Sequence, residues 1–178
     1  MSYDLQVPNG VFSRAGGATA NLSAVTGAAA KTYTTQNITF ANNSKMYYVA
    51  GAAGATTPTT DAVTGKAFKP LSIGQGCIYV WTLTSAGVVG LAQGPVPVSL
   101  PSGAIGTNLD SSGNFTAPPQ FPSLPDTLTP FAYQVVAVGA TYVGTGFIPG
   151  SSDNWNATGL TVTAQDLSFG LPATPQTA

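Results

Sequence analysis

The 178-residue chain contains no histidine, no glutamate and a single cysteine. Without His or Glu, a Ser-His-Asp triad, a His-based zinc site and a Glu general base are all excluded. Six aspartates remain, dispersed among turn-forming residues and strand ends. A carboxylate pair such as Asp110 and Asp153 would have to be assembled by the fold. We therefore predict that the protein is not an enzyme and that it holds no catalytic residues, cofactor or metal.

Charged residues are also scarce: they make up 6% of the chain, against about 25% in an ordinary soluble domain. Five cations and six aspartates leave a net charge of −1, with no basic run to neutralise a phosphate backbone. We expect no nucleic-acid partner. A net charge near zero also removes the repulsion that keeps monomers apart, which favours a subunit of a larger assembly.

The lone Cys77 cannot form an intramolecular disulfide and lies in the apolar run "CIYVWTL". We predict that it is a small buried hydrophobic residue. The opening "MSYDLQVPNG" has Asp4 and Pro8 where a secretion signal needs a cationic segment and then an apolar run. No apolar run approaches the roughly 20 residues that span a bilayer. We expect synthesis in the cytoplasm and no membrane partner.

The residues that are abundant, Val, Thr, Gly, Ala and the aromatics, favour strands and turns over helices. Residues 1–32 carry few large apolar groups and are predicted to form an extended N-terminal arm. Residues 33–170 are predicted to form a single β-rich domain, and residues 171–178 a loose C-terminal tail.

Within the β-rich domain, residues 77–92 predict a hairpin that turns at Ser85–Gly87, and residues 52–70 predict a long exposed loop. Residues 95–130 contain eight of the fourteen prolines and predict an extended connection that crosses the domain, with a turn at "LDSSGN". "FAYQVVAV" and "TYVGTGFI" predict a second hairpin joined by Gly139-Ala140, and "GLTVTAQDLSFG" a last strand.

Seven or eight strands with almost no helix predict an all-β fold, as an antiparallel β-sandwich, a jelly roll or a small barrel. Alternation along "YQVVAV" places Tyr133 and Val135 on one face and Gln134 and Val136 on the other. Both faces of this strand are therefore expected to be at least partly covered.

Aromatic residues provide the candidate contact sites. Trp155 lies in the polar stretch "SSDNWNATG", where an exposed indole would stack on a sugar or anchor a neighbouring subunit. Tyr47 and Tyr48 lie in the strand run "KMYYVAG" and are candidates for core or interface, and Phe12 is a candidate contact in the arm.

Residues 77–163 resemble a pattern in virion structural proteins of tailed bacteriophages. In that pattern a strand pair ends in an Ala-Gln-Gly turn, a Pro-x-Leu-Pro segment leads into a strand with Pro and Tyr, and a Phe and Gly turn precedes an Asn-rich loop. The matching residues here are Ala92, Gln93 and Gly94, then Pro122, Leu124 and Pro125, then Pro130 and Tyr133, then Phe147, Gly150 and Asn156.

The resemblance implies a decoration or cement protein on the surface of a capsid, with no catalytic residues to carry over. The implied partners are the major capsid protein and copies of the chain itself, with a trimer as the expected form. Two alternatives remain open: a fibre or tail appendage subunit, and a carbohydrate-binding β-module. The absence of long repeats or heptads argues against an elongated fibre shaft.

Overall fold

The computed structural model describes residues 10–11, 22–24, 32–98, 101–150, 155–167, 171–173 and 175. These residues contain no helix and form ten strands: Gly10–Val11 (β1), Leu22–Ala24 (β2), Thr32–Thr35 (β3), Ile38–Asn42 (β4), Lys45–Val49 (β5), Ala55–Thr56 (β6), Gly76–Leu83 (β7), Val89–Gln93 (β8), Thr129–Val138 (β9) and Leu160–Asp166 (β10). The all-β prediction is confirmed.

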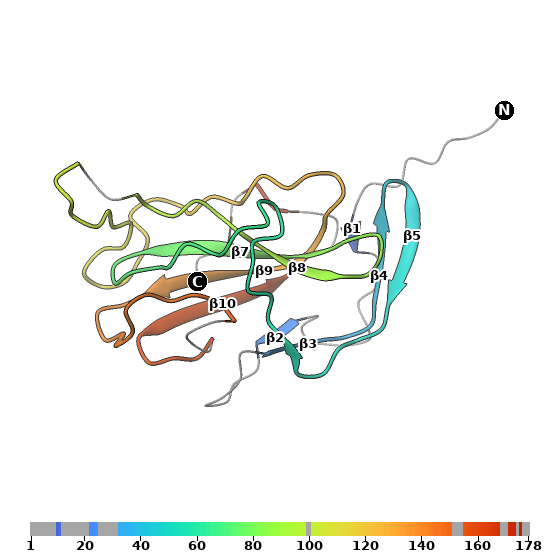
Figure 1. Cartoon of the computed structure of the whole chain (residues 1–178), viewed down its shortest axis with the longest axis horizontal. Coiled ribbons are helices and arrows are strands. Elements are labelled where there is room, and N and C mark those ends of the chain that lie inside the picture. Colours follow the sequence, from blue (N-terminus) through green and yellow to red (C-terminus); the bar gives the residue numbers. More distant parts are fainter. Residues whose placement is uncertain are drawn as a thin grey trace.

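The strands form three antiparallel sheets, ordered β10-β9-β7-β8, β1-β4-β5 and β2-β3-β6. None of the three closes on itself, so the small barrel is wrong and the layered arrangement is sandwich-like. The four-stranded sheet runs along the long axis of the molecule, and the β4–β5 hairpin crosses one end of it (Figure 1).

The central strands β7 and β9 are buried along their whole length, which confirms that both faces of β9 are covered. One face carries the larger core cluster, in which Tyr79 and Trp81 of β7 meet Tyr33 of β3 and Phe40 of β4. The other face carries Ile78, Val80, Tyr133 and Val135, packed against Phe115, Phe121 and Leu124. The Pro-rich connection therefore serves as the second cover of the sheet.

The predicted hairpin at residues 77–92 is confirmed: β7 pairs with β8 around a turn in which Gly87 has a φ of 77°. The predicted turn at "LDSSGN" is also confirmed, since Leu109 and Phe115 form a bridge around it. Cys77 is buried and free, as expected.

The hairpin predicted at Gly139-Ala140 is wrong, because β9 pairs with β10 and residues 141–148 form no strand. The chain turns at once after β9, where the Tyr142 N–H donates to the Gly139 carbonyl. Gly144 and Gly146 interrupt the following segment, and Val143 is 93% exposed. Two side chains of this segment, Tyr142 and Phe147, are buried in the larger core cluster, and Phe147 forms a bridge to Leu71.

The exposed loop predicted at residues 52–70 is wrong in part. It contains β6, which pairs with β3, and three of its side chains are buried: Thr57, Asp61 and Phe68. Phe68 is buried because its ring packs edge-on against Tyr79, with centroids 5.7 Å apart.

The predicted arm is described only at β1 and β2. β1 pairs with β4, and β2 pairs with β3, so these two short segments are joined to the body by strand pairing. Apart from Thr32, which begins β3, the other residues of the arm, including Phe12, lie outside the described residues, as does half of the predicted C-terminal tail.

Candidate functional site

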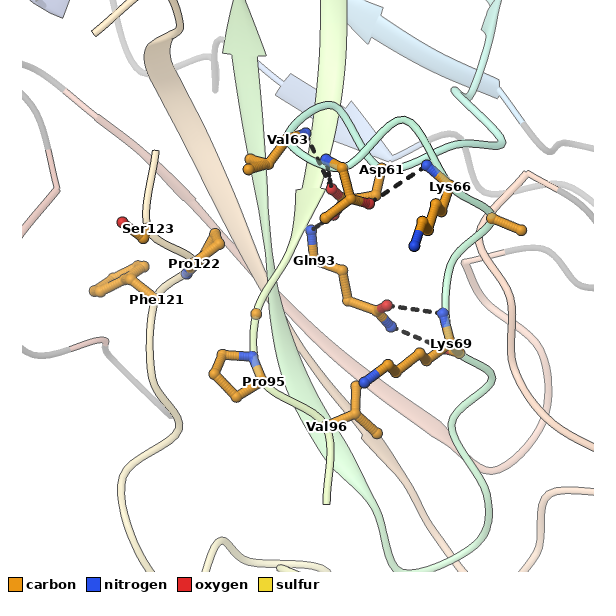
Figure 2. Close-up of a pocket in the computed structure, with 13 residues that line it drawn as sticks. Asp61, Val63, Lys66, Lys69, Gln93, Pro95, Val96, Phe121, Pro122 and Ser123 are labelled. Atoms are coloured by element: carbon orange, nitrogen blue, oxygen red, sulfur yellow. Dashed lines mark hydrogen bonds between the residues drawn. The ribbon is translucent and has the colours of Figure 1, made fainter. Parts of the chain in front are cut away.

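A groove of about 640 Å³ lies between the loop at residues 61–69, the end of β8 and residues 121–123 of the Pro-rich connection (Figure 2). Phe121, Pro122, Pro95 and Val96 form its apolar wall. Its polar side comes from the loop, which brings Asp61, Lys66 and Lys69 together with Gln93 of β8.

Asp61 is a buried carboxylate that holds three backbone amides. Its Oδ1 accepts hydrogen bonds from Val63 N at 3.0 Å and Thr64 N at 2.7 Å, which closes the local turn. Its Oδ2 accepts one from Gln93 N at 2.7 Å. Since backbone donors occupy both oxygens, this carboxylate fastens the loop to β8 and is not directed at a ligand.

Gln93 fastens the same loop from the other side. Its Oε1 accepts from Lys69 N at 2.8 Å, and its Nε2 donates to the Lys69 carbonyl at 2.8 Å (Figure 2). Its Nε2 also donates to Tyr79 Oη at 3.0 Å. From the sequence, Gln93 is assigned to an Ala-Gln-Gly turn, and no other role is predicted for it. Its structural role depends on Lys69, 24 residues away, and no local pattern indicates that pairing.

Two buried groups beneath the groove are kept neutral. Burial raises the pKa of the Cys77 thiol to about 12, although hydrogen bonds from Tyr79 and Gln93 oppose the shift. Burial also raises the pKa of the Tyr79 phenol well above its usual range. A protonated, enclosed thiol is a poor nucleophile, so Cys77 acts as a packing residue here.

The groove leaves two exposed cations, Lys66 and Lys69, beside an apolar wall. The segment "VTGKAF" ends like a phosphate-binding loop, but Thr60 and Ala67 replace residues that such a loop requires. In the structure, Gly65 N donates to the Asp61 carbonyl at 2.8 Å, so the segment is a closed turn. Among the described residues, Asp61 is the only carboxylate that lines the groove, and its oxygens are engaged.

Asp110, considered from the sequence as half of a carboxylate pair with Asp153, organises the turn at residues 110–114. Its Oδ1 accepts from Ser112 N and Asn114 N, at 2.8 and 2.9 Å. The hydrogen bond from the Asn114 backbone, with the others in this turn, lowers the pKa of the Asp110 carboxyl. Asp153, its hypothetical partner, lies outside the described residues. Among those described, no group of three or more His, Cys, Asp or Glu side chains could hold a metal ion.

Trp155 is not an exposed loop residue, and that part of the sequence interpretation is wrong. The indole is 4% exposed, and its Nε1 donates to Thr57 Oγ1 at 3.3 Å. Its ring lies 5.8 Å from Tyr79, 6.1 Å from Trp81 and 5.5 Å from Phe147. The polar neighbours of Trp155 in the sequence suggested exposure, whereas aromatic residues from distant parts of the chain bury it.

Tyr47 and Tyr48 lie on opposite faces of β5. Tyr47 is half-buried and stacks on Phe40 with ring centroids 5.4 Å apart. Tyr48 is 63% exposed, and Met46, on the same face of the strand, is 54% exposed. The sequence interpretation missed Met46, although the alternation in "KMYYV" places it with Tyr48.

The hairpin tip between β7 and β8 lies close to β5. A Cβ atom at Gly87 would lie 2.8 Å from Val49 Cγ2, and the adjacent Val88 is exposed. Met46 and Tyr48 are exposed apolar side chains on one face of β5, and we call this pair the β5 surface. Val88 is exposed at the hairpin tip, which approaches β5 from the side of Val49. The β5 surface can make apolar contacts and, through the strand edge, backbone hydrogen bonds.

No protein-family model, curated protein or solved structure matches this chain. In the part of the chain that the structure describes, no helix is long and apolar enough to cross a membrane.

Proposed function

We propose that the protein is a structural subunit of a tailed-phage particle that decorates the capsid shell and stabilises it as a cement protein. The observation that carries the proposal is the β5 surface, an apolar strand edge displayed by a chain with almost no charge. Such a surface suits association through burial and backbone hydrogen bonds. The kind of particle, that of a tailed phage, is inferred from the sequence resemblance across residues 77–163.

In this proposal the partners are the major capsid protein and copies of the chain itself, with a trimer as the expected assembly. The protein is located on the capsid surface. It carries out no reaction and requires no cofactor, in line with the lack of His and Glu in the sequence. Its contribution is the free energy of the contacts that it makes across the shell.

The test is the number of copies in purified particles, together with re-addition of the protein to particles that lack it. A shell protein is expected at hundreds of copies, and re-addition should raise the temperature at which the shell opens. A few copies, or a few dozen, would assign the chain to a fibre or tail appendage. Absence from the particle would refute the proposal.

The carbohydrate-binding alternative depended on an exposed Trp155. Because Trp155 is buried in the aromatic core, that observation no longer supports a sugar platform.

A further inference from the structure

β5 is an edge strand whose outward hydrogen-bonding groups can be assigned. It pairs on one side with β4, and no described strand lies on its other side (Figure 1). The two strands are joined by a two-residue turn in which Asn43 and Ser44 both have positive φ, 48° and 60°. In such a hairpin the residues that flank the turn, Asn42 and Lys45, form a hydrogen-bonded pair.

The alternation of an antiparallel ladder then fixes the remaining groups. Lys45, Tyr47 and Val49 direct their N–H and C=O groups toward β4. Met46 and Tyr48 direct theirs away from it. This edge, which no described strand pairs with, therefore offers two donors and two acceptors, and the exposed apolar side chains of β5 belong to the same two residues.

This edge differs from the edge at β8. There, Ala62 N donates to the Leu91 carbonyl at 2.9 Å and Gln93 N donates to Asp61 Oδ2, so the loop at residues 61–69 covers the strand. β5 contains no proline, and its one charge, Lys45, stands at its first residue. Bulges, prolines and mid-strand lysines usually protect an exposed edge from pairing with another strand. β5 has neither a proline nor a mid-strand lysine.

We propose that β5 pairs with β5 of a second copy of this chain, antiparallel, about a two-fold axis at Tyr47. In this register Met46 lies opposite Tyr48 of the partner subunit, and Lys45 lies opposite Val49 of the partner subunit. All four outward backbone groups on each strand are then used, which gives four hydrogen bonds across the axis. The two sheets join into one continuous sheet with the order β1-β4-β5-β5-β4-β1.

Charge favours this register. The two Lys45 side chains stand at opposite ends of the paired segment, about 13 Å apart along the strands, which exceeds the roughly 8 Å screening length at physiological salt. A shift of two residues in either direction would pair three strand residues in place of five. Met46 opposite the partner's Tyr48 also forms a cross-strand pair of a thioether and an aromatic ring, which is a favourable contact.

Size determines when the pair forms. A contact between two five-residue strands buries well under the roughly 1,200 Å² of a stable free complex. We therefore expect the pair to be weak in dilute solution and to form where copies are held close together. In that respect the inference rests on the proposed function, since a shell surface supplies the necessary local concentration.

Disulfide trapping tests the register, because the only native cysteine, Cys77, is buried. Met46→Cys and Tyr48→Cys chains are mixed at about 1 mM, the order of effective concentration between linked sites, and oxidised mildly. Residue 46 of one chain lies opposite residue 48 of the other. The two copies of residue 46, one from each chain, lie diagonally and are too far apart for a disulfide. We expect the 46–48 product to exceed both the 46–46 and the 48–48 product by about tenfold.

A mixture of Ser111→Cys and Thr145→Cys chains, both at exposed positions away from β5, measures random collision. If the 46–48 yield equals this background, or if the three products form in statistical proportion, the self-pairing is refuted.

A second variant separates this inference from the proposed function. Tyr48→Lys places a charge on the edge without removing core contacts, and Val143→Lys is the matched control at another exposed site. If wild-type chains bind particles but the Met46→Cys and Tyr48→Cys chains give no preferred 46–48 product, the inference fails and the proposed function stands. If the 46–48 product forms but the chains bind no particle, the proposed function fails and the pairing stands. If Tyr48→Lys abolishes particle binding while the two cysteine variants give no preferred 46–48 product, the occupant of the edge is a shell protein, and self-pairing is refuted.

Discussion

At the scale of single residues, polar groups in this protein fasten the chain to itself. The Asp61 carboxylate holds three backbone amides, and the Gln93 amide pairs with the backbone of Lys69 and with the Tyr79 hydroxyl. A buried polar group is tolerated when its hydrogen bonds are made within the fold. These side chains therefore stabilise the scaffold around the groove.

Cys77 should resist modification and should make stability depend on alkaline pH. With a pKa of about 12 in the folded chain, against 9.0 for an unperturbed thiol, Cys77 keeps its proton where the unfolded chain releases it. The folded state then binds more protons than the unfolded state, so the free energy of unfolding decreases as pH rises from about 9 to 12. Below pH 9 the contribution is fully present.

Two measurements test this expectation. Iodoacetamide at pH 8 should label Cys77 only after denaturation. Cys77→Ala should show a shallower loss of stability above pH 9 than the parent, while Tyr79, whose pKa is also raised, maintains part of the slope in both. Parallel curves for the two proteins would contradict the assigned role of the thiol.

Trp155 should behave as a core residue. Trp81 and Trp155 are the two tryptophans of the chain and both are buried, so native fluorescence should be blue-shifted and resistant to acrylamide. Trp155→Ala should lower the free energy of unfolding by about 3–5 kcal/mol. Tyr48→Ala, which removes an exposed aromatic, should change it by less than about 0.5 kcal/mol. A small effect of Trp155→Ala in chemical denaturation would show that the indole is not a core anchor.

At the scale of elements, the long strand β9 depends on an irregularity at its start. Its register with β7 shifts between Trp81 and Thr82, where Ala132 and Pro130 are the successive partners and Phe131 is the extra residue. Proline is accepted in a central strand at such a bulge, because the ladder is already interrupted there. Phe131 and Ala132 consequently both belong to the larger core cluster, and alternation resumes with Tyr133 on the other face.

The connection that precedes β10 should be sensitive to a single methyl group at Gly159. This glycine has a φ of 86°, and a Cβ there would overlap the backbone of Tyr142. Gly103 has a similar φ of 81° and nothing within 4 Å of the same position. Both substitutions by Ala carry the cost of a left-handed backbone, about 1 kcal/mol, but only Gly159→Ala adds the overlap.

We expect Gly159→Ala to lower the melting temperature clearly more than Gly103→Ala does. Equal shifts in calorimetry would show that φ alone matters and that the Tyr142 contact does not constrain this turn.

At the scale of the whole molecule, exposed apolar side chains occur toward both ends of the four-stranded sheet. The β5 surface lies beside the β7–β8 hairpin tip. Ile73 lies in the turn before β7, and Val143 follows the turn after β9. Both are at the other end of the sheet, where Gly74 N donates to the Val138 carbonyl. An elongated subunit with few charges and apolar groups at both ends is suited to contacts along its long axis (Figure 1).

Under the proposed function, binding of this protein to particles should depend only weakly on salt. With 6% charged residues and a net charge of −1, ion pairs can contribute little, and apolar burial at about 25 cal/mol per Å² must supply most of the free energy. Re-addition to stripped particles between low and high ionic strength should give nearly constant occupancy. Release at high salt with the fold intact by circular dichroism would show that the contact is electrostatic.

The sequence by itself determined the fold class and several elements. Its β-branched and aromatic runs predicted the strands, the Ser85–Gly87 segment the first hairpin, and the prolines of residues 95–130 an extended crossing connection. These features are local: strand propensity, turn chemistry and the missing N–H of proline act through neighbouring residues, whatever the rest of the chain does. Burial of Cys77 and of both faces of β9 also followed from the pattern of apolar residues.

The tertiary structure alone decided which strands pair and which aromatics are exposed. β9 pairs with β10 and not with residues 141–148, because Gly139 and Gly159 bring the ends of those two strands together. Trp155 is buried because Tyr79, Trp81 and Phe147 converge on it from distant parts of the chain. The groove likewise depends on Asp61 and Gln93, which lie 32 residues apart and become neighbours only through the fold. Long-range partners of this kind leave no trace in local composition, since any apolar or amide side chain would satisfy the local pattern equally well.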